Sequence, residues 1–107
     1  MKLPPRIRPN TATSLAELRA GIDAIDAEIM QLLAERLAYA DAVVPLKAAA
    51  GIAAAAPSRV QDVINKVRNK AQETGFDPEI AEPMWRVMIE AIIAREQRSL
   101  GFEGEDK

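Results

Sequence analysis

The chain has 107 residues, enough for one domain, and its 14 Lys and Arg against 16 Asp and Glu leave a formal charge of -2. This balance argues against a dedicated nucleic-acid-binding protein, which usually carries a strongly basic domain or stripe. Because the chain has no Cys and no His, disulfides, thiol nucleophiles, Cys or His zinc sites and imidazole-based triads are excluded. The Ala-rich composition with 4% aromatic residues is typical of an all-α protein.

Residues 1–13 are predicted to form a flexible N-terminal arm, because their prolines and basic residues cannot build a core. The arm has no apolar run of the kind that a secretory signal needs. No uncharged stretch of the chain approaches the ~20 apolar residues of a membrane span. We therefore expect a cytoplasmic protein with no nucleic-acid partner and no membrane partner.

The first predicted helix begins at Ser14, which forms an S-x-x-E capping box with Glu17. The helix is expected to continue to about Val44, where Pro45 should kink or end it. Apolar residues follow Ser14 in alternating steps of three and four, which indicates a heptad-like stripe on one helix face. These residues are Leu15, Leu18, Ile22, Ile25, Ile29 and Leu32.

The second predicted helix follows a connecting segment rich in alanine, residues 48–56. Gly51 interrupts that segment, and we expect the segment to be a connecting loop that is partly helical and mobile. The helix is expected to begin at Pro57, since proline is favoured in the first turn, and to stop at Gly75.

The third predicted helix begins with an Asp77–Pro78 pair, which is a strong N-cap and first helical residue, and ends near Leu100. Residues 101–107 are expected to be a frayed acidic tail. Residues 14–100 would then form one domain of three helices.

The unequal helix lengths predict an oligomer. A first helix of about 45 Å cannot bury its whole stripe against two shorter helices. The apolar remainder would need a second copy of the chain as cover. We therefore expect an all-α, intertwined helical homodimer.

Arg36 interrupts the stripe of the first helix, one step of four after Leu32. A charge at such a position is costly unless it is paired or lies in a solvated cavity. Lys47 lies eleven residues further on, within about 20° of Arg36 around a continuous helix. Arg19 lies about 100° away from Arg36, so these two could converge on one small ligand only if Arg19 came from a partner chain.

Glu96 interrupts the third helix in the same way, after Trp85, Ile89 and Ile92, and the second helix opens with Arg59. Taken singly, each charged residue also fits an ordinary surface position, and Glu96 also fits a frayed helix end. Taken together, several basic groups beside apolar stripes, with one carboxyl among them, suit a pocket for a small dianion. Arginine favours such ligands because its fork binds carboxylates through two hydrogen bonds.

A series of motifs extends this interpretation over roughly residues 14–100. Its members are Leu18-Arg19-x-x-Ile22-Asp23-x-Ile25-Asp26, Leu32-Leu33-Ala34-Glu35-Arg36, Lys47, Pro57-x-Arg59 and Ile92-x-x-x-Glu96. With gaps of 17, 11, 12 and 37 residues between its charged members, the series resembles the all-helical chorismate mutase family.

The resemblance implies an intertwined dimer with two shared active sites for a small dicarboxylate substrate. In each site, Arg19 of the other subunit would bind one substrate carboxylate and Arg36 the other. Lys47 would donate to the ether oxygen and a carboxylate, with Arg59 supporting the same charge. Glu96 would take the position of the second donor to the ether oxygen.

Ile92 would line the substrate site at a position where many family mutases have Ser. Many mutases also carry acidic residues at the positions of Ala56 and Val60. In this apolar lining the chain resembles the related isochorismate pyruvate lyases, which usually have Gln where Glu96 stands.

The favoured function is therefore a chorismate mutase of aromatic amino acid biosynthesis, in the shikimate pathway. It would rearrange chorismate to prephenate without a metal or cofactor. The first alternative is an isochorismate pyruvate lyase, which forms salicylate and pyruvate. A non-catalytic helical dimerisation module would explain the stripes but not the charges on them.

Overall fold

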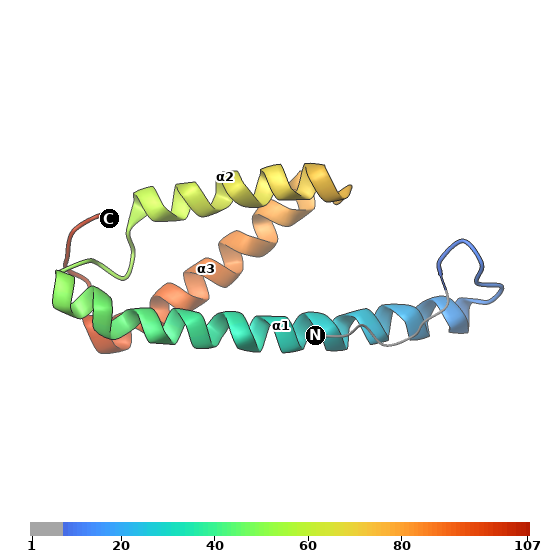
Figure 1. The fold of residues 1–107 in the computed structure, drawn as a ribbon, viewed down its shortest axis with the longest axis horizontal. Coiled ribbons are helices and arrows are strands. Elements are labelled where there is room, and N and C mark those ends of the chain that lie inside the picture. The colour runs from blue at the N-terminus through green and yellow to red at the C-terminus, as the bar shows by residue number, and fades with distance from the viewer. Residues whose placement is uncertain (1–7) are drawn as a thin grey trace. The chain divides into compact units, whose positions relative to one another are not determined.

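The computed structural model describes residues 8–107 and contains three α-helices (Figure 1). They are α1 (Leu15–Ala50), α2 (Pro57–Thr74) and α3 (Pro78–Leu100). Within the described range the only extended pairing is an isolated bridge between Ile52 and Glu105. These observations confirm the all-α class with helices of unequal length, which hold 36, 18 and 23 residues. No helix from residue 8 onward is long and apolar enough to cross a membrane.

The chain divides into two compact units, residues 1–38 and residues 39–107, and the boundary falls within α1. The predicted arm belongs to the first unit, and its residues 1–7 lie outside the described part of the chain. Just before α1, the backbone N–H groups of Thr11 and Ala12 both donate to the Arg8 carbonyl and form a turn.

The predicted start of α1 is confirmed. The Ser14 hydroxyl accepts a hydrogen bond from the Glu17 backbone N–H at 3.1 Å, as an N-cap does. The Thr13 hydroxyl donates to the Glu17 carboxylate at 2.7 Å, and this bond lowers the pKa of Glu17. The helix start is thus specified by residues within one turn of each other.

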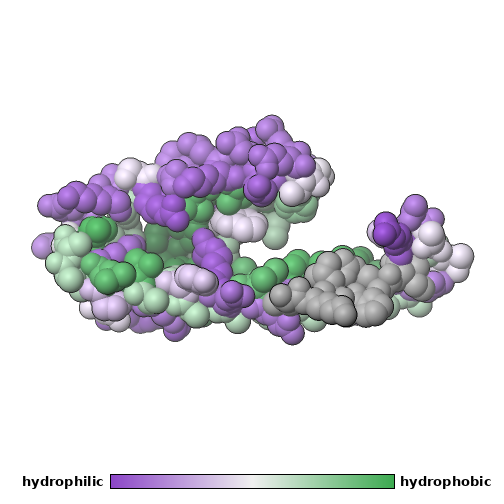
Figure 2. Space-filling model, in the orientation of Figure 1, coloured by the Kyte–Doolittle hydropathy of each residue, from purple (hydrophilic) through white to green (hydrophobic). Residues whose placement is uncertain are grey.

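In the first unit, the predicted apolar stripe of α1 lies on an exposed helix face. Figure 2 shows hydrophobic surface along this stretch of α1. Between 38% and 61% of the surface of each stripe residue stays accessible, at Leu15, Leu18, Ile22, Ile25, Ile29 and Leu32. An apolar face this long is typical of a surface that packs against another protein chain.

The predicted end of α1 near Val44 is wrong, because the helix continues through Pro45 to Ala50. Proline removes one helical hydrogen bond, but the alanines that follow are strong helix formers. Gly51, at a φ of 70°, ends the helix instead. The Gly51 N–H donates to the Ala48 carbonyl and the Ile52 N–H to the Lys47 carbonyl, which is a Schellman motif. The connecting loop is therefore residues 51–56.

In the second unit, α2 and α3 form an antiparallel hairpin (Figure 1). Gly75, at a φ of 81°, ends α2 in a second Schellman motif, as predicted. The Asp77 carboxylate caps α3 by accepting from the Glu79 backbone N–H at 2.9 Å, also as predicted. Small and branched side chains are buried on these two helices, at Ile64, Ala71, Ala81 and Ile89. The outer face of α2 is hydrophilic (Figure 2).

Charged residues join the two helices of the hairpin. Arg68 on α2 donates to Glu79 at 2.7 Å and to Glu82 at 2.9 Å, both on α3. Arg86 donates to the other oxygen of Glu82 at 2.8 Å. The hydrogen bonds from Arg86 and Arg68 lower the pKa of Glu82. Glu82 thus serves as the shared acceptor of a network that links α2 to α3.

The expectation of a frayed acidic tail is wrong. Residues 101–107 are bonded to the loop between α1 and α2, through the backbone of Glu105 and the carboxylate of Asp106. These contacts give a short polar segment an ordered position that its composition did not indicate.

Candidate active site

Lys47 and Glu96 meet in the second unit, although they are 49 positions apart. The Lys47 ammonium donates to a Glu96 carboxylate oxygen at 3.1 Å and to the Ala54 carbonyl at 3.3 Å. Only 16% of the Lys47 side chain and 6% of the Glu96 side chain are exposed. An ammonium has three N–H donors, so these two bonds leave a third for the oxygen of a ligand.

Glu96 points inward, which excludes both the surface position and the frayed helix end. The preceding members of its stripe also face inward, since Ile89 is buried and Trp85 and Ile92 are half-buried. A buried carboxylate is tolerated when a nearby cation pairs with it, and here the cation is Lys47. Towards Lys47, Glu96 acts as an acceptor.

Arg59 lies on the exposed side of α2, with 58% of its side chain accessible. It donates to Asp62, one turn along the helix, at 2.7 Å, and Lys66 donates to the same carboxylate at 3.0 Å. The hydrogen bonds from Lys66 and Arg59 lower the pKa of Asp62. The structure therefore brings Arg59 to Asp62 rather than to Lys47 or Glu96.

Arg19 and Arg36 both lie on the part of α1 that belongs to the first unit. Arg19 is exposed and Arg36 is half-buried. Their roles at a substrate stay predictions.

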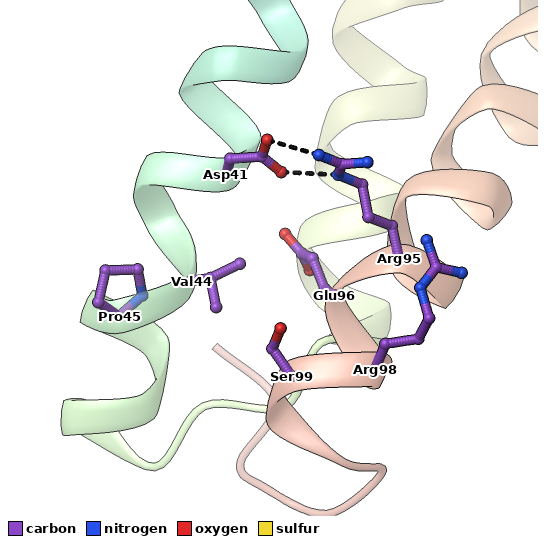
Figure 3. A pocket seen from close by; sticks show the side chains of 7 residues that line it. All are labelled: Asp41, Val44, Pro45, Arg95, Glu96, Arg98 and Ser99. Carbon is purple, nitrogen blue, oxygen red and sulfur yellow. Dashed lines mark hydrogen bonds and ion pairs between the residues drawn. The ribbon is translucent and has the colours of Figure 1, made fainter.

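A pocket of about 390 Å³ lies between α3 and the last turns of α1 in the second unit (Figure 3). Glu96 is part of its lining, so the pocket adjoins the Lys47–Glu96 pair. At its rim, Arg95 donates to both carboxylate oxygens of Asp41 at 2.9 Å, and this paired bond lowers the pKa of Asp41. The full lining is Asp41, Val44, Pro45, Arg95, Glu96, Arg98 and Ser99.

Sequence reasoning missed three contributions to this region. The Asp41–Arg95 pair joins two polar helix faces. A pattern of apolar residues does not indicate which polar residues will pair. The Ala54 carbonyl is a backbone group, whose partner a sequence cannot indicate. The contacts of Glu105 and Asp106 come from a tail whose composition is typical of disorder.

Comparison with known proteins identifies the family of the chain. Residues 18–97 match the family model of chorismate mutase type II. The chain is 34% identical over 88 residues to an isochorismate pyruvate lyase of Pseudomonas aeruginosa, covering 82% of this chain and 86% of that protein. It is also 34% identical over 76 residues to a chorismate mutase of Methanocaldococcus jannaschii, covering 71% of this chain and 77% of that protein. The resemblance inferred from the motifs is thereby confirmed, and the chain belongs to the type II chorismate mutase family.

Proposed function

We propose that this protein is a chorismate mutase, which rearranges chorismate to prephenate. The observation that carries the proposal is the shielded Lys47–Glu96 pair, with one ammonium N–H left for a ligand. Family membership supports an enzyme of this class. The reaction has one substrate and proceeds without a covalent intermediate, which suits a chain that has no Cys and no His.

The protein would accelerate this reaction in two ways. Binding both carboxylates would hold the substrate in the compact conformer in which the reacting atoms are close. The Lys47 ammonium would stabilise the negative charge that grows on the ether oxygen as its bond breaks. Because Lys47 is already bonded to Ala54 and Glu96, little reorganisation would be needed at that moment.

Arginines would supply the rest of the dianion site. Arg36 would bind one substrate carboxylate, and Arg59 would support the charge near Lys47. The pair of Arg59 with Asp62 is exposed, and exposed ion pairs contribute little free energy, so Arg59 can exchange Asp62 for a substrate carboxylate. Arg19 would bind the other substrate carboxylate in the site of a second subunit.

That second subunit would cover the exposed stripe of α1. The first unit has no other helix among its described residues that could bury this face. A second copy of the chain offers an equally long apolar face, so an intertwined homodimer would bury both.

A second candidate function is isochorismate pyruvate lyase. In the substrate site that the resemblance implies, Ala56, Val60 and Ile92 would give an apolar lining where many mutases of the family have polar residues, and Ala56 is 2% exposed. One similar protein carries the lyase name. The same dianion site would then hold isochorismate and release pyruvate.

The test is to incubate the purified protein with chorismate and with isochorismate separately and to identify the products. Prephenate from chorismate is the expected result. Salicylate and pyruvate from isochorismate, without prephenate from chorismate, would favour the lyase. Turnover of neither substrate would contradict both assignments. A Lys47→Ala preparation should lose the activity and a Lys70→Ala preparation should keep it, because Lys70 pairs with Glu73 on the exposed side of α2.

A further inference from the structure

The C-terminal tail, residues 101–107, pairs with the loop between α1 and α2. The Glu105 backbone N–H donates to the Gly51 carbonyl at 2.7 Å, and the Ala53 N–H donates to the Glu105 carbonyl at 2.9 Å. These bonds make the bridge between Ile52 and Glu105. Two backbone groups of the loop are thus satisfied by the tail.

Asp106 caps α2 from outside the helix. Its Oδ1 atom accepts from the Ser58 backbone N–H at 2.9 Å and from the Ser58 hydroxyl at 2.8 Å, across 48 positions. The residue at the N-cap itself is Ala56, whose side chain cannot accept a hydrogen bond. The tail therefore supplies the cap that the local sequence of α2 lacks.

Gly104 lets the tail approach the loop closely. Its φ is 145°, a conformation that L side chains rarely adopt. A Cβ atom added there would lie 2.5 Å from the Ala53 nitrogen and 2.8 Å from the Ala53 Cα. Only glycine fits this position without displacing the loop.

The segment held in this way contacts Lys47. Ala53 and Ala54 are 6% and 3% exposed, and the Ala54 carbonyl accepts from the Lys47 ammonium at 3.3 Å. Lys47 is therefore held between Glu96 on one side and a loop carbonyl on the other. The residue next to that carbonyl is the one bonded to the tail.

We propose that Asp106 and Gly104 are positioning residues for Lys47. Asp106 holds the start of α2, Gly104 brings the tail against Ala53, and together they keep the Ala54 carbonyl in place. For turnover, this inference rests on the proposed function, in which Lys47 acts on the substrate. Because small misplacements of a catalytic group cost rate, the tail contributes to kcat more than to KM.

The first test measures backbone amide hydrogen exchange in Asp106→Ala. The matched control is Glu103→Ala, which removes the same charge from an exposed residue of the same tail. Loss of an N-cap is expected to accelerate exchange at Ser58 and Ala53 about fivefold, while the Ile89 amide in α3 stays protected. Asp106→Asn should restore the wild-type rates, since Asn accepts the same hydrogen bond. Equal exchange in Asp106→Ala and Glu103→Ala would overturn the proposal.

The second test measures the chemical reactivity of the Lys47 amine and needs no substrate. Trace acetylation with acetic anhydride, followed by mass spectrometry, gives the reactivity of each lysine. Lys47 is expected to react faster in Asp106→Ala and in Gly104→Ala than in wild type, and Lys70 to react equally in all three. An unchanged Lys47 reactivity would overturn the proposal even if the loop exchanges faster.

Kinetics complete the test on whichever substrate the wild-type protein converts. Asp106→Ala should lower kcat about fivefold with little change in KM, and Asp106→Asn should recover most of it. A change confined to KM would contradict a positioning role. If the wild type converts neither substrate, the proposed function fails, while the acetylation result still decides whether the tail positions Lys47.

Discussion

The contacts and burial of Lys47 support a chemical role for this residue. Its ammonium is mostly shielded from solvent, and two of its donors are occupied by groups from α3 and from the loop before α2. The ammonium of a surface lysine would be hydrated, and its N–H donors would have no fixed direction. Here the remaining donor has a defined direction, which is what electrostatic preorganisation requires.

Lys47→Ala should lower kcat/KM at least ~100-fold, the scale of removing one donor to a developing oxyanion. The loss should fall mainly on kcat, because the charge on the ether oxygen grows in the transition state. Lys47→Arg should not restore full activity, since a planar fork differs in reach from a compact ammonium. Steady-state kinetics measures these effects, with Lys70→Ala as the matched control. A loss confined to KM would mean that Lys47 only binds the ground state.

Glu96→Gln should raise activity at neutral pH. The ether oxygen only accepts hydrogen bonds, so Glu96 can donate to it only when protonated. Gln offers a neutral donor and keeps an oxygen for Lys47, so the variant should gain activity at neutral pH.

Steady-state kinetics of the wild type and Glu96→Gln at neutral pH measures this gain. Glu90→Gln is the control, because Glu90 is an exposed carboxyl on the same helix. Equal activity of the wild type and Glu96→Gln would contradict a donor role for Glu96.

At the scale of the elements, the helix starts and the end of α2 were predictable because their chemistry is local. The Ser14 cap, the Asp77 cap and the Gly75 motif each join groups within five residues. The end of α1 was not predictable in this way, since both Pro45 and Gly51 are residues at which a helix can end. Gly51 ends the helix because its left-handed conformation allows two hydrogen bonds, whereas Pro45 only removes one.

Glu82→Gln should destabilise the α2–α3 hairpin at neutral pH and not at strongly acidic pH. Arg86 and Arg68 hold the pKa of Glu82 below its ordinary value of 4.5. A carboxyl whose pKa is depressed on folding contributes stability above that ordinary value, and the contribution is lost as the pH falls through the folded-state pKa.

Thermal unfolding of the wild type and Glu82→Gln between pH 7 and pH 2 should show two midpoints that converge on acidification. Glu90→Gln should follow the wild type throughout, since this carboxyl lies outside the network. Parallel curves with a constant gap would show that the effect of Glu82→Gln is not electrostatic.

At the scale of the whole molecule, the proposed homodimer would use a second copy of the chain to cover the exposed stripe on α1. Arg19 and Arg36 lie about 100° apart around this helix, so one straight helix cannot direct both at one small ligand. The proposed shared site would take the two arginines from different chains.

Mixing Arg19→Ala chains with Arg36→Ala chains should therefore restore activity that neither variant has alone. One of the two sites in each mixed dimer would hold both arginines, so free exchange should recover about a quarter of wild-type activity. Mixing wild type with the double variant is the control, since its mixed dimers would have no complete site. Mixed dimers as inactive as both parents would contradict the shared site.

The sequence by itself determined the all-α class, the caps of the helices and the membership of the family, because all three depend on residue type and spacing along the chain. It also marked Lys47 and Glu96 as charges on apolar stripes. Only the tertiary structure decided that they form one shielded pair, because the fold brings together two residues that are 49 positions apart. The tertiary structure also decided that Asp106 binds Ser58 at the start of α2, across 48 positions. It likewise decided that Arg95 binds Asp41, across 54 positions. A hydrogen bond between residues so far apart in the sequence depends on how the loops place the helices and the tail. No local pattern of residues specifies that placement.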